Sequence, residues 1–198
     1  MVGDGGLTEV LMRRRWLGLG PLVLLVACAG AGAFGHFVGS VKTEWIDPDR
    51  RMRLLDDFSY VDPSGVEWKA PKDAVIDGAS IPRALWTIVG SPFTGEYRNA
   101  SVVHDVACVR RDRPWQDVHR MFYDACRCGG VGEQKAKLMY GAVFHFGPRW
   151  TSDGRLIVLA RTKPIEEELE SLQAFVESTN PSLEAIEKFV PPGEEPPG

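Results

Sequence analysis

Residues 97–126 read YRNASVVHDVACVRRDRPWQDVHRMFYDAC, and this stretch decides the fold. Apolar and small residues recur at helical spacing in its first half and again in its second half. The polar link between the halves, residues 110–114, is short. The stretch therefore predicts two helices, 97–110 and 115–126, that pack as antiparallel neighbours.

Upstream of this helix pair, the sequence predicts a small antiparallel sheet. The turn sequence Asp62-Pro63-Ser64-Gly65 separates two segments of strand composition, so we expect a β-hairpin there. A loop then leads into a short helix whose N-cap is Ser80. The elements expected in this region are strands at 51–60, 66–70 and 74–76 and a helix at 83–89.

Downstream, apolar residues at helical spacing predict helices at 133–146 and 166–178, and Ser182 is expected to cap a last short helix. The fold class expected is α+β. A short antiparallel hairpin or sheet precedes a bundle of about three core helices, and a helical extension follows. We place a single α+β domain at 46–160 and an acidic, Pro-rich extension at 161–198.

The N-terminal residues have the form of a lipoprotein signal. A basic segment at 12–15, Met-Arg-Arg-Arg, precedes an apolar run at 16–26, and a small residue then precedes Cys28. The run is too short to span a bilayer, which needs about 20 apolar residues. We expect residues 1–27 to be removed and Cys28 to be lipidated; a plain secretory signal or an uncleaved anchor is the alternative.

This signal leads to an expected location. Residues 28–45 begin with a Gly-rich stretch and are expected to form a flexible tether. The uncharged Ala29 after the cysteine is compatible with sorting to the outer membrane. We therefore expect a lipid-anchored protein of the cell envelope, on the periplasmic side of the outer membrane, with the membrane as a partner through its anchor.

The charge distribution argues against a nucleic-acid partner. The formal net charge is −4, so the chain has no basic footprint for a phosphate backbone. From Arg161 onward the sequence holds nine Glu and only three Arg or Lys. The acidic C-terminal helix is therefore the segment expected to dock any protein partner.

Two adjacent polar residues interrupt the apolar face of the first helix. Burying His104 and Asp105 costs several kcal/mol unless both have partners. Asp117 and His119 of the second helix are the candidates to face His104. A partner on one ring nitrogen leaves the other free to accept a proton from water, as in a general base. Asp105 points about 100° round the helix, which suits a divalent cation.

The loop Asp77-Gly78-Ala79-Ser80 is the second candidate for chemistry. A carboxylate and exposed carbonyls can help to hold calcium, and the start of a helix can bind an anion near Ser80 and Arg83. The alternative is that Asp77 and Ser80 only cap the helix. Cys108 shares a helix face with His104, but nothing in the sequence marks it as a nucleophile.

The ordered motifs resemble the domain-of-unknown-function 1353 family of phages and bacteria. The resemblance covers about residues 50–151, and that family implies a small domain without an established activity. It is carried by the motifs at 77–86, His104-Asp105, 115–123 and 137–150.

His104-Asp105 and the acidic helix that follows are also similar to the helix pair of secreted phospholipases A2. That resemblance implies His104 as the base, Asp105 as a calcium ligand, and Asp77-Gly78 as part of the calcium loop. Asp117 would orient the base, with His119 as the alternative. The Cys-rich framework and the Gly-Cys calcium loop of those enzymes are absent here.

Two hypotheses follow. The first is an envelope-anchored, metal-assisted hydrolase, with possible Ca²⁺, that cleaves an ester or amide of lipid or cell wall. The second is a non-catalytic envelope or phage-related binding module, in which His104, Asp105, Asp117 and Arg83 form a structural polar network. The first requires His104 and Asp105 to line an open cleft near Asp77, whereas the second allows them to be sealed.

Overall fold

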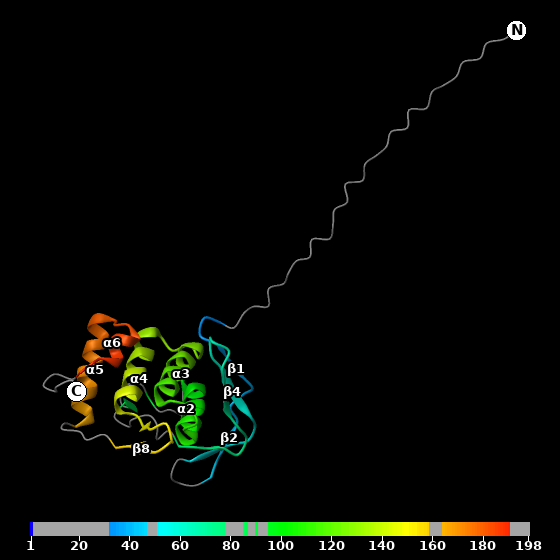
Figure 1. Ribbon diagram of the computed structural model, residues 1–198. Helices are drawn as coiled ribbons and strands as arrows, with labels where there is room; N and C mark the ends of the chain where they lie inside the picture. The colour runs from blue at the N-terminus through cyan, green and yellow to red at the C-terminus, as the bar shows by residue number, and fades with distance from the viewer. Residues whose placement is uncertain are drawn as a thin grey trace. The chain divides into compact units, whose positions relative to one another are not determined.

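The computed structural model describes residues 1, 32–46, 51–77, 85–86, 90, 95–158 and 164–190. The chain divides into two units, Met1–Gly30 and Ala31–Gly198, and every element below belongs to the second (Figure 1). Within the described residues, no helix combines the length and the hydropathy that crossing a bilayer requires. The predicted lipoprotein signal, including Cys28, lies outside the described residues.

Two three-stranded antiparallel sheets form the N-terminal part of this unit. Their strand orders are β1-β4-β5 and β2-β3-β6. Side chains of β5 alternate between exposed and buried, as expected for a sheet with one face on the core. The strands are β1 (His36–Val38), β2 (Thr43–Trp45), β3 (Met52–Leu54), β4 (Phe58–Val61), β5 (Glu67–Ala70) and β6 (Val75–Ile76).

The hairpin predicted around residues 62–65 is confirmed as the β4–β5 pair. Asp62 stabilises its turn, because its Oδ1 accepts hydrogen bonds from the backbone N–H groups of Ser64 (2.9 Å) and Val66 (3.0 Å). Its Oδ2 accepts from the indole of Trp68 (2.9 Å). Gly65 has φ +86°, which a glycine adopts without a steric penalty.

The single strand predicted at 51–60 is wrong, because it is two strands in different sheets. β3 ends at Leu54 and β4 begins at Phe58. Between them, the Asp56 carboxylate accepts from Lys42 Nζ (2.8 Å) and the Asp57 carboxylate accepts from the backbone N–H of Lys72 (2.8 Å). Two polar residues that bind neighbouring segments therefore bend the chain at this point.

The tether predicted at 28–45 is also wrong over the described part of that range, since it contains β1 and β2. The ring of Phe37 stacks on Phe58 at a centroid distance of 5.6 Å. A Cβ on Gly35 would lie 2.1 Å from the carbonyl oxygen of Val61. Here glycine permits a close approach of two backbones instead of providing flexibility.

Three helices form the bundle predicted from the sequence: α2 (Arg98–Arg110), α3 (Trp115–Cys128) and α4 (Glu133–Phe146). α3 packs between α2 and α4, and α2 also packs on β5 (Figure 1). The α+β class and the helix positions are therefore confirmed. Of the helix predicted at 83–89, only Leu85 and Trp86 are described, and both are helical.

A short hairpin after α4 was not predicted. It consists of β7 (Arg149–Trp150) and β8 (Leu156–Ile157). The indole of Trp150 donates to the carbonyl of Arg113 (2.8 Å), and Arg111 Nη1 donates to the carbonyl of Gly154 (3.2 Å). These bonds hold the hairpin against the link between α2 and α3.

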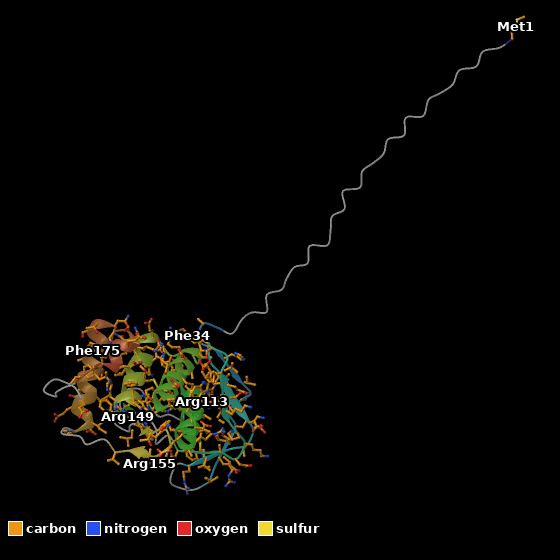
Figure 2. The ribbon with its side chains drawn as sticks, in the orientation of Figure 1. Met1, Phe34, Arg113, Arg149, Arg155 and Phe175 are labelled. Atoms are coloured by element: carbon orange, nitrogen blue, oxygen red, sulfur yellow. The ribbon has the colours of Figure 1, made fainter. Side chains whose placement is uncertain are left out.

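The C-terminal helices α5 (Ile165–Thr179) and α6 (Leu183–Glu187) pack on α4. Leu172 and Ile186 are fully buried there, and a Cβ on Gly141 would lie only 2.9 Å from Leu172 Cδ2. Phe175 of α5, labelled in Figure 2, stacks on Phe189 at a centroid distance of 5.1 Å. The apolar stripe of this acidic extension is therefore part of the domain core.

Replacing Leu172 tests this packing. We expect Leu172→Ala to lower the free energy of unfolding by about 2–5 kcal/mol, because it removes a fully buried side chain and leaves a cavity. The matched control is Leu156→Ala, at a leucine that is 53% exposed, with a change within about 0.5 kcal/mol. Urea unfolding followed by circular dichroism gives both values, and equal effects would contradict the packing described.

Candidate functional site

The centre of the candidate site is a pair of buried histidines on adjacent helices. His104 of α2 and His119 of α3 each have 0% exposure. Nε2 of His104 lies 2.9 Å from Nδ1 of His119. The ring of Phe122 packs on His104 at a centroid distance of 4.6 Å. Of the two partners expected for His104, the structure thus places His119 beside it.

A backbone carbonyl fixes the direction of the hydrogen bonds through this pair. Nε2 of His119 lies 3.1 Å from the carbonyl oxygen of Pro148. A carbonyl only accepts, so this nitrogen carries the hydrogen and Nδ1 of His119 is an acceptor. His104 must then donate from Nε2, which leaves its Nδ1 as an acceptor, 4.0 Å from Sγ of Cys108.

Both rings are neutral at neutral pH. Burial lowers the pKa of His104 well below its ordinary value, and the neighbouring His119 lowers it further. Burial lowers the pKa of His119 to about 3; the Pro148 carbonyl opposes this shift and the charge of Arg149 adds to it. Neutral imidazole is the form that accepts a proton or binds a metal ion.

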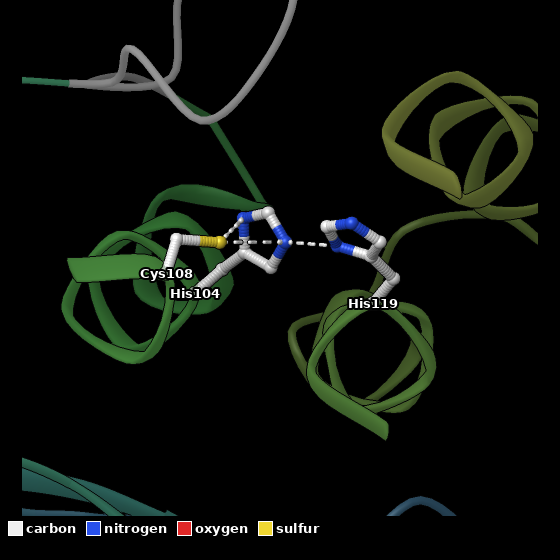
Figure 3. Close-up of side chains that lie close together, drawn as sticks. All are labelled: His104, Cys108 and His119. Carbon is white, nitrogen blue, oxygen red and sulfur yellow. Dashed lines mark hydrogen bonds between the residues drawn. The ribbon is translucent and has the colours of Figure 1, made fainter. Parts of the chain in front are cut away.

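Cys108 completes a compact cluster with the two histidines (Figure 3). It lies one helical turn after His104, and its Sγ is 3.7 Å from Nε2 and 4.0 Å from Nδ1 of that ring. Because these distances are nearly equal, the sulfur lies beside the ring and not along one lone pair. One nitrogen from each ring and Sγ all lie within 4.8 Å of one another, so they are potential ligands of one metal ion.

Cys108 also lines a cavity of about 580 Å³. The polar part of its wall includes Asp77, Asp105 and Arg111. The apolar part is formed by five residues: Val75, Val109, Phe146, Pro148 and Leu156. His104 is fully buried and lies behind Cys108, outside this lining. The cavity thus meets the histidine cluster through the thiol.

Asp77 and Asp105, two of the predicted cation ligands, lie on the wall of the same cavity. Asp117, the predicted orienting residue, is on the exposed side of α3, where it does not take the place beside His104 that His119 occupies. Gly78, Ser80 and Arg83 lie outside the described residues.

Whether His104 and Asp105 line a cleft or are sealed separates the two hypotheses, and the two residues differ in this respect. Asp105 lines an open cavity together with Asp77, as a hydrolase requires. His104 is sealed, and its Nε2 has a partner in the protein, as a structural network allows. The polar wall of the cavity is therefore formed by carboxylates, a thiol and the Arg111 guanidinium, and the two histidines are not part of it.

Two contributors were missed from the sequence. Cys108 had a signal in its spacing, since it lies four residues after His104 on the same helix face. The Pro148 carbonyl had none, because a backbone acceptor has no residue-specific signature. Its position depends on how the chain leaves α4.

Comparisons with known proteins agree with the family resemblance. Residues 52–143 match the family described as "Protein of unknown function (DUF1353)". Two uncharacterized proteins of Sinorhizobium fredii are similar. y4jT is 43% identical over 152 residues, which are 74% of this chain and 45% of y4jT. y4iH is 46% identical over 115 residues, which are 58% of this chain and 48% of y4iH.

The chain therefore spans about half the length of these curated relatives. No solved structure matches it significantly. The family prediction is confirmed, and the names of the relatives carry no activity.

The depressed pKa values predict a dependence of stability on pH in the presence of a chelator. In the unfolded chain the pKa of His119 is near 6.5, whereas burial in the folded protein lowers it to about 3. The contribution of this histidine to the free energy of unfolding is therefore complete above pH 6.5 and is lost as the pH falls towards 3. Between about pH 7 and pH 5 this histidine accounts for a loss of about 2 kcal/mol.

Replacing the ring by a neutral amide removes this contribution. Between pH 7 and pH 5, the free energy of unfolding of His119→Gln should therefore fall by about 2 kcal/mol less than that of the wild-type protein, whatever the stability of the variant at pH 7. Urea unfolding at several pH values measures the slope. The burial argument fails if both proteins have the same slope.

Proposed function

We propose that this domain, which belongs to the DUF1353 family over residues 52–143, is a metal-assisted hydrolase. It cleaves an ester bond of an acyl lipid in the cavity beside Cys108. One observation carries the proposal. Carboxylates, a thiol and a guanidinium share a cavity whose remaining lining is mostly apolar and includes three exposed aliphatic side chains. Such a cavity suits a substrate that has a polar reacting group and an apolar chain.

The polar wall provides the groups for hydrolysis. Asp77 follows β6 and Asp105 belongs to α2, so the fold brings together two carboxylates that are far apart in the sequence. Arg111 is held in place, since its Nε donates to the Cys108 carbonyl (3.2 Å) and its Nη1 to the Gly154 carbonyl (3.2 Å). Its charge suits an anionic headgroup or the oxyanion formed during ester cleavage.

The apolar wall supports a lipid substrate. Val75, Val109 and Leu156 line the cavity and are 41%, 71% and 53% exposed. They come from three different segments, and Val158, which is 92% exposed, follows Leu156 closely in the chain. Single exposed apolar residues are ordinary, but several that converge on one cavity mark a binding surface.

Asp105 is the base that this geometry favours. It lines the cavity, although it is only 4% exposed, whereas His104 is fully buried and does not line it. In the proposed step, the Asp105 carboxylate takes a proton from water while the water oxygen adds to the ester carbonyl. The tetrahedral intermediate then collapses to the carboxylic acid and expels the alkoxide, which leaves as the alcohol after it takes the proton back from Asp105. The sequence-based role of His104 as base and the Ca²⁺ site at Asp77, Gly78 and Asp105 stay predictions.

The lipoprotein signal at the N-terminus stays a prediction, as does an envelope location. A lipid anchor at Cys28 and a lipid substrate would be compatible, because both belong to a membrane. The alternative function is a non-catalytic binding module. It is favoured by the sealed histidine pair, whose hydrogen bonds to each other and to Pro148 need no substrate.

The catalytic role of Asp105 is tested with the full chain and dioctanoyl-phosphatidylglycerol, with titration of the released fatty acid. We expect Asp105→Asn to lower the rate by about 100-fold or more, because the amide cannot take a proton from water. Asp117→Asn, at an exposed carboxylate on α3, is the matched control and retains the rate. No release by the wild-type protein with added Zn²⁺ or Ca²⁺, or undiminished release with a chelator, would refute the metal-assisted hydrolase.

The apolar wall is tested by chain length. Each methylene that enters an apolar site contributes about 0.8 kcal/mol, so kcat/KM rises about fourfold per methylene between butanoyl and octanoyl esters. Val109→Ser should weaken this dependence, whereas the control Val38→Ser, at an exposed valine on β1, should not. If neither variant changes it, the lipid substrate is wrong, and a polar cell-wall amide becomes the substrate to assay.

A further inference from the structure

The cluster of His104, Cys108 and His119 lies directly beneath the cavity. Three potential ligands converge in it, and one of them, the Cys108 thiol, reaches the cavity wall. We propose that His104, Cys108 and His119 bind a Zn²⁺-class transition-metal ion whose open coordination position faces the cavity. This inference rests on the proposed function in one respect only, since it names the metal of that hydrolase; binding of the ion does not require hydrolysis.

The donor set selects the class of ion. Two imidazoles and a thiolate are ligands for zinc and similar borderline-soft ions, whereas calcium requires six to eight oxygens. Catalytic zinc sites have three protein ligands and keep a fourth position for water or substrate. In this cluster the fourth position would open beside Cys108, on the side where Asp105 lines the cavity.

The distances suit one tetrahedral ion. Zinc lies about 2.0–2.1 Å from imidazole nitrogen and about 2.3 Å from thiolate sulfur, so its ligand atoms are about 3.3–3.6 Å apart. Here Nε2 of His104 is 2.9 Å from Nδ1 of His119 and 3.7 Å from Sγ of Cys108. For one ion to replace the shared proton, the two nitrogens must move apart by a few tenths of an ångström, and Sγ of Cys108 must move closer to the His119 nitrogen, from which it lies within 4.8 Å.

The protonation states favour binding. His119 already offers a lone pair on Nδ1, because the Pro148 carbonyl holds the hydrogen on Nε2. Metal-bound histidines commonly make this kind of second hydrogen bond, which orients the ring. His104 needs to move its hydrogen from Nε2 to Nδ1, and the Cys108 thiol loses its proton to solvent. Binding of one divalent ion therefore releases one proton.

The charge left at the centre is small. A divalent ion and one thiolate have a net charge of +1, and Asp105 lies on the wall of the cavity that Cys108 also lines. Arg149, whose charge lowers the pKa of His119, opposes binding. The guanidinium of Arg149 lies over the ring of Trp115, 4.6 Å from the centroid. This cation–π contact stabilises part of the arginine charge. A water on the ion would have Asp105 as its nearby base.

The test uses the full chain after removal of metal with a chelator. Titration with Co²⁺ followed by absorption spectroscopy reports a thiolate ligand through its charge-transfer band and a tetrahedral site through strong visible bands. We expect one ion per chain, displaced by Zn²⁺ but not by Ca²⁺. Calorimetry in buffers of different ionisation enthalpy should give one proton released. These measurements need no substitution.

Variants then identify the ligands. Cys108→Ser should abolish the charge-transfer band, and His119→Gln should weaken Co²⁺ binding by at least about 10-fold to 100-fold. The controls are Cys128→Ser and His145→Gln, at residues outside the cluster, and both should keep the wild-type spectrum. Circular dichroism with the chelator present checks that each variant is folded.

Three outcomes would overturn the inference: an octahedral spectrum without a thiolate band, a band that persists in Cys108→Ser, or equal displacement by Ca²⁺. The result is separable from the hydrolase. A tetrahedral thiolate-bound ion without ester cleavage supports this inference and refutes the proposed function. Ester cleavage that depends on Ca²⁺, with no Co²⁺ bound at the cluster, does the reverse.

Discussion

The hydrogen bond between His104 and His119 is the constraint on which the arrangement of the domain depends. Two imidazoles buried without partners would cost several kcal/mol, so α2 and α3 must meet in the one register that pairs them. The second nitrogen of His119 then requires an acceptor, which the chain supplies at Pro148 directly after α4. One line of hydrogen bonds therefore ties three segments together and explains why a polar pair is tolerated on an otherwise apolar helix face.

Helix geometry determines the directions in which the functional side chains of α2 point. His104 and Cys108 are four residues apart and lie on the same face, whereas Asp105 is turned about 100° from His104. The helix thus directs an imidazole towards α3, a thiol to the floor of the cavity and a carboxylate to its wall. Asp77, from the end of a distant strand, meets the same wall because β6 packs against α2.

Sequence reasoning located the helices well because each carries an apolar stripe that persists over several turns. It was weaker for the strands. Strands of two to four residues have too few positions to establish a period, and the split between β3 and β4 depends on bonds from Asp56 and Asp57 to distant segments. At the site, His104, Asp105 and His119 could be found because polar residues stand out on an apolar helix. The spacing of Cys108 placed it on the face of His104 but assigned it no role, since a cysteine on such a face is also an ordinary core residue.

The position of Pro148 separates the boundary of the family match from the boundary of the folding unit. The match ends at residue 143, before the carbonyl that fixes the hydrogens of the histidine pair, and before the two helices that cover α4. It also begins after β1 and β2. A gene fragment trimmed to the family match would thus encode a polypeptide with both flanks of its core exposed and one imidazole nitrogen without its acceptor. In this protein, the family match marks the middle of the folded unit, and the flanking segments that complete it are the parts most easily discarded in cloning.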